Sequence, residues 1–123
     1  MNVLVIALDA ETVDVGDAEV LVVAPALNSR LRHWLSDEDG ARRRAEERVA
    51  VYVDRLERAG AHAHGSVGDA DPVQAIADAL VTFPADEIVI ASDGSLAEKL
   101  RSRARERFTL PILRSPEPLP HAA

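Results

Sequence analysis

The sequence predicts a Rossmann-like α/β fold, in which helices cover both faces of an open, five-stranded parallel sheet. Three short runs, at residues 3–8, 20–24 and 88–91, are apolar at every position, as is typical of strands buried on both faces. The run 61–64 alternates Ala with His, and the run 110–114 has a proline near its start, so both indicate edge strands. Helical patterns separate most of these runs, and this alternation is typical of βαβ units.

The longest helical pattern covers residues 37–59, where apolar side chains recur at helical spacing. Residues 36–39, Ser-Asp-Glu-Asp, are suited to cap its N-terminus, and Gly60 is suited to end it. A short helical piece is expected just before it, at residues 29–35.

Two further helices follow, each with sequence signals at its start. Asp71 is expected to cap the first of them, with Pro72 in the first turn and Gln74 closing a capping box. The second is expected to begin with a capping box formed by Ser95 and Glu98. Both helices lie between predicted strands, where a parallel sheet needs its crossovers.

Length and composition restrict the class of protein. The 123 residues suit one domain, which we assign to residues 1–114, followed by a proline-rich tail at 115–123. A formal net charge of −7 argues against nucleic-acid binding, which needs a basic surface. No apolar run is long enough to span a membrane and no basic segment precedes the first strand, so we expect a cytoplasmic protein without membrane contact. Because cysteine is absent, a disulfide, a thiol nucleophile and a cysteine zinc site are excluded.

Three stretches together resemble the universal stress protein superfamily. They are the apolar strand that ends at Asp9, the segment 67–76 in which Gly68 precedes Pro72 and a helix, and the Ala-Asp-hydrophobic strand at 85–91. The resemblance covers most of the chain from residue 19 to residue 114. It implies the strand order 3-2-1-4-5, which places the three apolar runs inside the sheet and the other two at its edges.

The resemblance also implies a place for a ligand, at the switch point between the first and fourth strands, beyond their carboxyl ends. There, the Asp of the family approaches the bound nucleotide, and the matching residue is Asp9. The residues expected to bind a ligand are Asp9, Gly68, Ser92, Gly94 and Ser95.

The chain departs from the nucleotide-binding pattern of the family after the fourth strand. ATP-binding members carry a glycine, a second glycine three positions on, and a third with Ser or Thr after ten more. Residues 91–98 retain one glycine, Gly94, and the spacing is lost. Asp9 and Asp93 would also repel a phosphate unless a divalent cation lay between them. We therefore expect no cofactor; the alternative is ATP or AMP with magnesium.

Other clusters of polar residues have simpler interpretations. His62 and His64 are expected to point to the same face of an edge strand; such a pair can bind a transition metal, but a solvated strand face is preferred because no third ligand is evident. The arginines at 42–44 and at alternate positions from 101 to 107 are interleaved with glutamates and are expected on solvent faces. Trp34 is expected in core or interface packing.

The link between the first two strands, residues 9–18, is short for a crossover helix and contains Gly16. The first crossover helix is therefore predicted to be missing or very short. One row of the first strand, either Leu4, Ile6 and Leu8 or Val3, Val5 and Ala7, would then need cover from a second subunit or from the tail. This argument, together with the free edge of the last strand, predicts a homodimer.

No nucleophile motif, paired-carboxylate site or metal-ligand triad is present in the sequence, and nothing in it supports an enzyme. The preferred hypothesis is a non-catalytic domain, stress-related or regulatory, that acts through self-association or a protein partner. The alternative is a domain that binds ATP, AMP or cyclic AMP with atypical loops.

Overall fold

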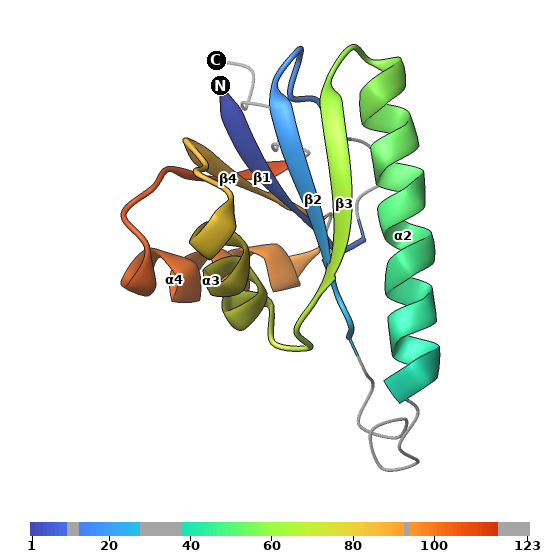
Figure 1. Cartoon of the computed structure of the whole chain (residues 1–123). Coiled ribbons are helices and arrows are strands. Elements are labelled where there is room, and N and C mark those ends of the chain that lie inside the picture. The colour runs from blue at the N-terminus through green and yellow to red at the C-terminus, as the bar shows by residue number, and fades with distance from the viewer. Residues whose placement is uncertain (10–12, 28–37, 93, 116–123) are drawn as a thin grey trace.

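The computed structural model describes residues 1–9, 13–27, 38–92 and 94–115. Five parallel strands form one open sheet in the order β3-β2-β1-β4-β5, with helices packed on it (Figure 1). The predicted fold class and strand order are confirmed. The elements are β1 (Asn2–Ala7), β2 (Glu19–Pro25), α2 (Glu38–Arg58), β3 (His62–Gly68), α3 (Pro72–Thr82), β4 (Glu87–Ala91), α4 (Ser95–Arg107) and β5 (Ile112–Ser115).

The sheet separates two core clusters. The cluster on the α2 side holds Val3 and Val5 of β1 together with Tyr52 and Leu56 of α2. The cluster on the other side holds alternate residues of the same strands and the buried faces of α3 and α4. Figure 1 shows α2 on one side of the sheet and α3 and α4 on the other, as right-handed crossovers in this strand order require.

The connection from β1 to β2 contains no helix in its described part, residues 13–18. Gly16 has a positive φ of 65°, and its N–H donates to Asp14 Oδ1 at 3.1 Å, so a tight turn precedes β2. The prediction of a missing first helix therefore holds over residues 13–18.

One row of β1 was expected to need cover from a second subunit or from the tail, and it has cover within the single chain. Val3, Val5 and Ala7, the row on the α2 side, are all at most 1% exposed in the single chain. The physical reason is that the β1–β2 connection turns its own valines inward: Val13 and Val15 pack against the α2-side cluster. Cover for β1 thus gives no argument for a second subunit.

The end of α2 matches its sequence signal. Gly60 has a φ of 102° and donates its N–H to Glu57 O, while Ala61 donates to Leu56 O. This pair of bonds is a Schellman motif, which satisfies carbonyls at the end of the helix. Ser36 and Asp37 of the predicted N-terminal cap lie outside the described residues, as do the short helix at 29–35, Trp34 and the tail beyond residue 115.

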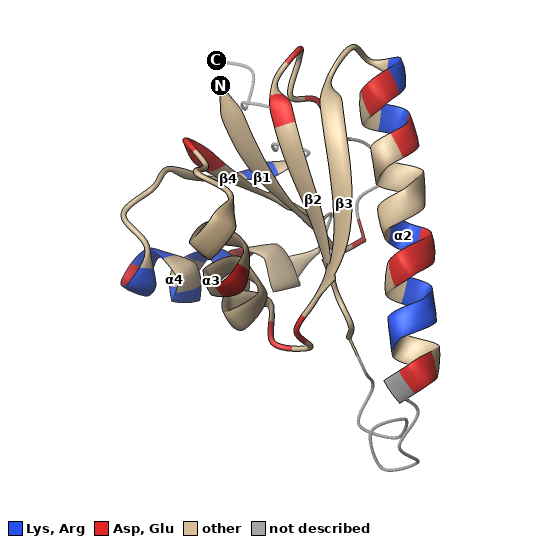
Figure 2. Ribbon diagram, viewed as in Figure 1, with Lys and Arg blue, Asp and Glu red and all other residues tan. Residues whose placement is uncertain are grey.

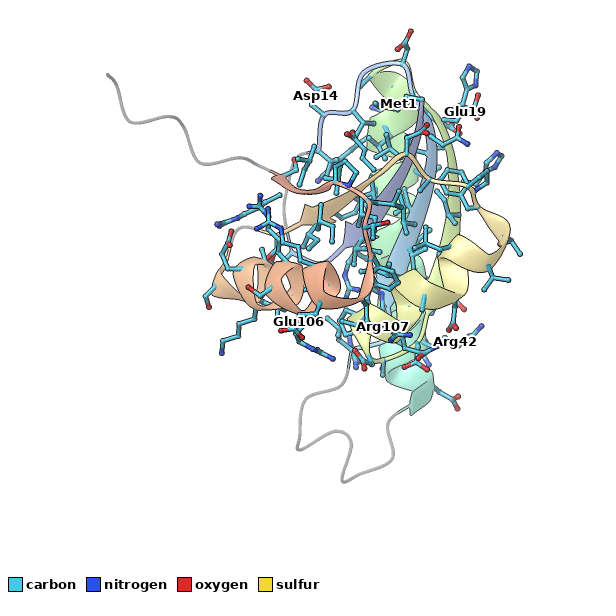
Figure 3. All side chains as sticks on the ribbon, turned by 90° about the vertical axis from the view of Figure 1, so that its left-hand side faces the viewer. Met1, Asp14, Glu19, Arg42, Glu106 and Arg107 are labelled. Atoms are coloured by element: carbon cyan, nitrogen blue, oxygen red, sulfur yellow. The ribbon has the colours of Figure 1, made fainter. Side chains whose placement is uncertain are left out.

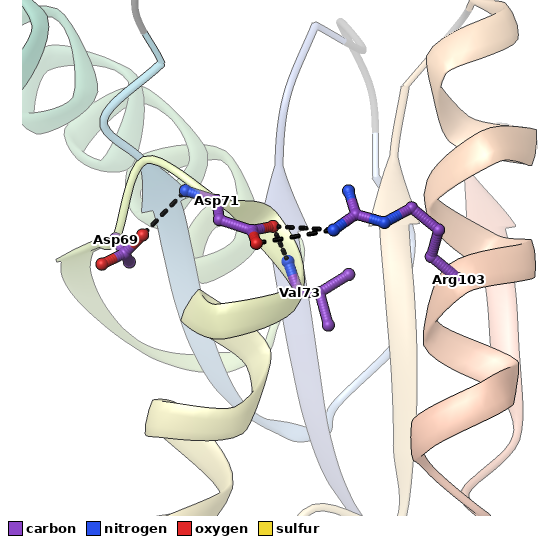
Figure 4. Close-up of polar contacts among 4 residues, drawn as sticks. All are labelled: Asp69, Asp71, Val73 and Arg103. Atoms are coloured by element: carbon purple, nitrogen blue, oxygen red, sulfur yellow. Dashed lines mark hydrogen bonds and ion pairs between the residues drawn. The ribbon is translucent and has the colours of Figure 1, made fainter.

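The start of α3 is capped by Asp71, as predicted, but without a capping box (Figure 4). Asp71 Oδ1 accepts from the Val73 N–H at 3.0 Å, while the Asp71 N–H donates to Asp69 Oδ1 at 2.8 Å. Gln74 was expected to take that N–H; instead it donates to Asp78 Oδ1, one helical turn on. Asp69 is closer along the loop and completes an Asx turn.

Two strands differ from their predicted bounds by more than one residue at an end. β3 continues to Gly68, four residues beyond the prediction, and β5 begins at Ile112 rather than at residue 110. Pro111 lies outside β5, although its carbonyl accepts from the Ile88 N–H at 2.9 Å. Within the described ranges, no helix is long and apolar enough to cross a membrane.

Candidate functional site

The carboxyl ends of β1 and β4 are tied together at the switch point of the sheet. The backbone N–H groups of Leu8 and Asp9 both donate to Ala91 O, at 3.1 and 3.2 Å. This bifurcated contact brings the loop that begins at Asp9 beside the loop that leads into α4. The structure therefore brings Asp9, Ser92, Gly94 and Ser95 to one edge of the sheet.

Ser92 is fully buried, and its polar groups are used within the fold. Its hydroxyl accepts from the Gly94 N–H at 3.2 Å, and its N–H donates to Ser115 O at 3.0 Å. These bonds shape the turn into α4 and attach it to β5. Ser92 therefore has a structural role here. Asp93, between these two residues, lies outside the described residues.

The beginning of α4 differs from its prediction. Ser95 is the first residue of the helix and Gly94 holds the N-cap position, and among the described residues no side chain caps the helix. The predicted Ser95–Glu98 capping box was therefore wrong. Glu98 turns instead toward two arginines, with Arg114 Nη1 at 3.3 Å and Arg101 Nη1 at 3.8 Å from its Oε1, and these ion pairs compete for the carboxylate.

Asp9 lies beside this uncapped start. Its Oδ2 is 3.8 Å from the point that a Cβ on Gly94 would occupy. A helix N-terminus carries partial positive charge, so a carboxylate is favoured there. Asp9 therefore supplies negative charge at the position where a phosphate of a nucleotide would otherwise bind.

Gly68, the fifth expected ligand residue, is a packing position. It ends β3, with β2 between it and β1. A Cβ there would lie 2.7 Å from Val23 Cγ1 and 2.8 Å from Ala75 Cβ, so only glycine lets the first turn of α3 approach the sheet this closely. The resemblance of the 67–76 segment to a nucleotide-binding family thus has a structural explanation.

Two arginines of α2 belong to this edge of the sheet and were not among the expected site residues. Arg44 and Arg48 are both half-buried, whereas Arg42 and Arg43 are exposed as predicted. Arg48 Nη1 donates to Pro25 O, at the end of β2, at 3.3 Å. Arg44 and Arg48 are one helical turn apart and lie beside the buried positions Ala41, Ala45 and Tyr52. This spacing could have predicted from the sequence that the two arginines lie on the side of α2 that faces the sheet.

Burial lowers the pKa of Arg48, and Arg44 acts in the same direction; Tyr52 and Asp9 act in the opposite one. Asp9 is thus within electrostatic range of Arg48 as well as of the α4 N-terminus. The edge combines one carboxylate, a cationic side chain and a helix start.

Charged residues of both signs alternate along α2 (Figure 2). Figure 3 places Asp14 and Glu19 at the end that holds Met1, where the strands start, and Arg42, Glu106 and Arg107 toward the opposite end. At that opposite end, Arg103 Nη2 lies 3.3 Å from Asp71 Oδ1 and so joins α4 to the start of α3 (Figure 4).

His62 and His64 point to the same face of β3 and are both exposed, as predicted. Across the part of the chain that the structure describes, no three or more His, Asp or Glu side chains form a cluster that could hold a metal ion. The solvated edge strand is therefore the better description of this pair.

A groove of about 310 Å³ lies on the same face, between β3 and α3. Its floor is apolar, and Asp69 and Asp78 are among the residues that line it. It lies at the β3 edge of the sheet, away from the β1–β4 switch point.

Comparison of the chain with models of protein families, with curated proteins and with solved structures finds no match. Membership in the universal stress protein superfamily therefore stays a prediction that rests on the three stretches of sequence.

Proposed function

We propose that this chain is a non-catalytic, universal-stress-protein-like domain that acts through self-association or a protein partner. The observation that carries the proposal is the position of Asp9, whose carboxylate lies against Gly94 at the start of α4. The helix start that would hold a phosphate already has an anion of the chain beside it, and a second anion there would be repelled.

The neighbouring groups add to this argument. The Ser92 hydroxyl accepts from the Gly94 N–H, and one Arg48 nitrogen donates to Pro25 O. Ser92 and Arg48, two of the polar residues at this edge, therefore also have roles within the fold.

Isothermal titration calorimetry with ATP, AMP and cyclic AMP, each with and without magnesium, tests the proposal. The expected result is weak or absent binding of all three. Tight binding of any of them would contradict it and favour the alternative below.

The alternative function is adenine-nucleotide binding with atypical loops, and one observation favours it. Within the described part of the chain, no side chain caps α4, and a Cβ on Gly94 would meet only the Asp9 carboxylate. If Asp9 turned toward Arg48, the helix start could accept a phosphate. Under this alternative, a magnesium ion would offset the charge of Asp9 when ATP or AMP is the ligand.

A further inference from the structure

The outer edge of β3 has no strand beside it among the described residues. β3 is the first strand in the sheet order and pairs only with β2. Figure 1 shows it at one margin of the sheet, beside α2. The strand is seven residues long and carries no Lys, Asp, Glu or Pro, the residues that commonly protect such edges.

The hydrogen bonds to β2 identify the backbone groups that face outward. The His62 N–H donates to Ala18 O, and Gly68 O accepts from the Ala26 N–H, so the even-numbered residues of β3 bond to β2. In a parallel ladder, the intervening residues direct their N–H and C=O groups away from that neighbour. These residues are Ala63, Gly65 and Val67, and only Val67 O has a further contact, from the Ser66 hydroxyl at 3.4 Å.

The groove between β3 and α3 opens beside this edge. Apolar side chains from both layers, Leu21, Val23 and Ala79 among them, line it, and Ser66 and Thr82 are exposed along it. A strand added to β3 would direct alternate side chains onto this face of the sheet. The edge supplies main-chain hydrogen bonds, and the groove supplies side-chain contacts.

The charge of the groove selects the occupant. Asp69 and Asp78 line it and are exposed, and within the described ranges neither forms an ion pair. A second copy of this chain carries the same carboxylates and the same net charge of −7, so it would be repelled from this edge. A partner segment with Lys or Arg at alternate positions is complementary to it.

We propose that the β3 edge and the β3–α3 groove bind an extended, basic peptide segment, which pairs with β3 as a sixth strand and places cationic side chains near Asp69 and Asp78. This is strand addition, in which main-chain bonds supply affinity and alternate side chains supply specificity. The inference rests on the proposed partner-binding function and names one surface and one partner chemistry for it.

The test uses a capped, fluorescently labelled peptide of alternating Val and Lys, matched to the seven residues of β3. Fluorescence anisotropy with the full chain at low salt is expected to give a Kd below about 1 mM. A Val–Glu peptide of the same length is expected to bind at least about tenfold more weakly. N-methylation at alternate residues of the Val–Lys peptide removes the N–H donors along one edge and places methyl groups there, so binding is expected to be lost when that edge faces β3.

Variants of the protein locate the site. Ala63→Pro removes an outward N–H without a ladder bond to β2 and is expected to abolish binding. Asp78→Lys is expected to weaken binding of the Val–Lys peptide by about 3- to 10-fold. Glu106→Lys makes the same charge change on α4, which packs on β4 and β5 at the opposite edge of the sheet. This variant is the matched control and is expected to leave the Kd within about twofold of the wild-type value. If Ala63→Pro does not fold, Asp78→Lys and the N-methylated peptide show whether the peptide binds at the β3 edge and the groove.

Three outcomes would overturn the inference: no binding of the Val–Lys peptide at about 1 mM, equal binding of the Val–Lys and Val–Glu peptides, or a dimer that Ala63→Pro dissociates, since the occupant would then be a second copy. Each of these leaves the proposed non-catalytic role intact. Tight nucleotide binding, in contrast, would contradict that role and leave the peptide result unchanged.

Discussion

At the scale of single residues, two glycines of β3 are required by space rather than by backbone conformation. A Cβ on Gly65 would collide with Val49 Cγ1 of α2 and lie 3.2 Å from Val53 Cγ2. Gly68 has the same relation to Val23 and Ala75 on the opposite face. Each glycine therefore lets a helix lie close against the edge strand.

The first prediction concerns Gly65. Gly65→Ala is expected to destabilise the fold by about 1–3 kcal/mol, because the added methyl group forces Val49 or the backbone of α2 to move. Urea denaturation monitored by circular dichroism measures the change. Gly94→Ala is the control and is expected to cost less, within about 1 kcal/mol, the usual penalty for alanine at an N-cap. Among the described residues its Cβ would meet only Asp9 Oδ2, at 3.8 Å, and its φ is negative.

A double variant separates crowding from other effects of Gly65→Ala. Adding Val49→Ala removes the methyl groups that collide, so the double variant should lose less stability than the sum of the two single variants. Additive losses would mean that α2 packing does not account for the glycine.

The second prediction concerns Asp9 and distinguishes the two proposed functions. Under the non-catalytic proposal, Asp9→Asn removes the anion beside α4, so affinity for inorganic phosphate should rise by about 2- to 10-fold. Chemical shifts of the Ser95 and Leu96 amides, followed by NMR during a phosphate titration, measure it. Asp54→Asn, on the exposed face of α2, is the matched control.

The nucleotide-binding alternative predicts a different result. If Asp9 approaches a bound nucleotide, as the family resemblance implies, Asp9→Asn should reduce binding of ATP or AMP measurably. A wild-type chain that binds nucleotide, with an Asp9→Asn variant that does not, would exclude our proposal.

At the scale of elements, α3 and α4 are joined through the cap of α3. Asp71 both accepts from the Val73 N–H and pairs with Arg103 across 3.3 Å. Figure 4 shows this carboxylate between the two contacts. The pair is about half exposed, so solvent screens it and the cap bond should dominate.

The third prediction follows from this geometry. Asp71→Ala is expected to lower the free energy of unfolding by about 0.5–2 kcal/mol, the usual effect of losing an N-cap. Asp71→Asn retains a capping oxygen but loses the charge, so it should cost less, within about 1 kcal/mol. Thermal denaturation of both variants compares the contribution of the cap bond with that of the ion pair. Equal losses of stability in the two variants would mean that the ion pair with Arg103 contributes more than the cap bond.

The sequence was sufficient for the order of elements because each signal was local. The apolar runs of β1, β2 and β4 predict burial on both faces, and Gly60 predicts the end of α2. The full length of β3 was not predictable in this way, because Gly65 and Ser66 are typical of loops and the reason for Gly65 lies in α2. The same limit applies to Arg48, whose contact is the carbonyl of Pro25 in another element.

The site was predictable only in part, for the same reason. The switch point correctly indicated that Asp9 and Gly94 would meet. The capping box at Ser95 failed because Arg114, which is distant in sequence, pairs with Glu98. Gly68 was assigned to a ligand because its local pattern matched, whereas its requirement comes from contact with Val23 and Ala75.

At the scale of the whole molecule, the sheet ends in two edges of different chemistry. β3 is seven residues long and lies beside an acidic groove. β5 is four residues long, and its Arg114 pairs with Glu98 of α4. Charge repulsion between two copies of the chain is therefore expected at the β3 edge and not at the β5 edge. We expect self-association to use the β5 edge for this reason.

The last prediction is that the chain forms a homodimer through β5. Among the described residues, β5 pairs only with β4. On the α2 side of the sheet, α2 lies over β2 and β3, so no described helix lies over β5 on that side. The carbonyl of Pro111 accepts from Ile88 of β4, and that of Ser115 accepts from Ser92, just after β4. The N–H groups of Ile112 and Arg114 therefore face away from β4. Two such edges can pair around a two-fold axis and continue the sheet across the dimer.

Light scattering at micromolar concentration is expected to give twice the chain mass of 13.3 kDa. Arg114→Pro removes an outward N–H without touching the ladder to β4 and should give a monomer. Arg114→Ala loses the same contact with Glu98 but keeps the N–H, so it should remain dimeric; this comparison separates strand pairing from the ion pair. A wild-type chain that stays at 13.3 kDa would exclude the dimer, and an Arg114→Pro variant that stays dimeric would place the interface elsewhere than β5.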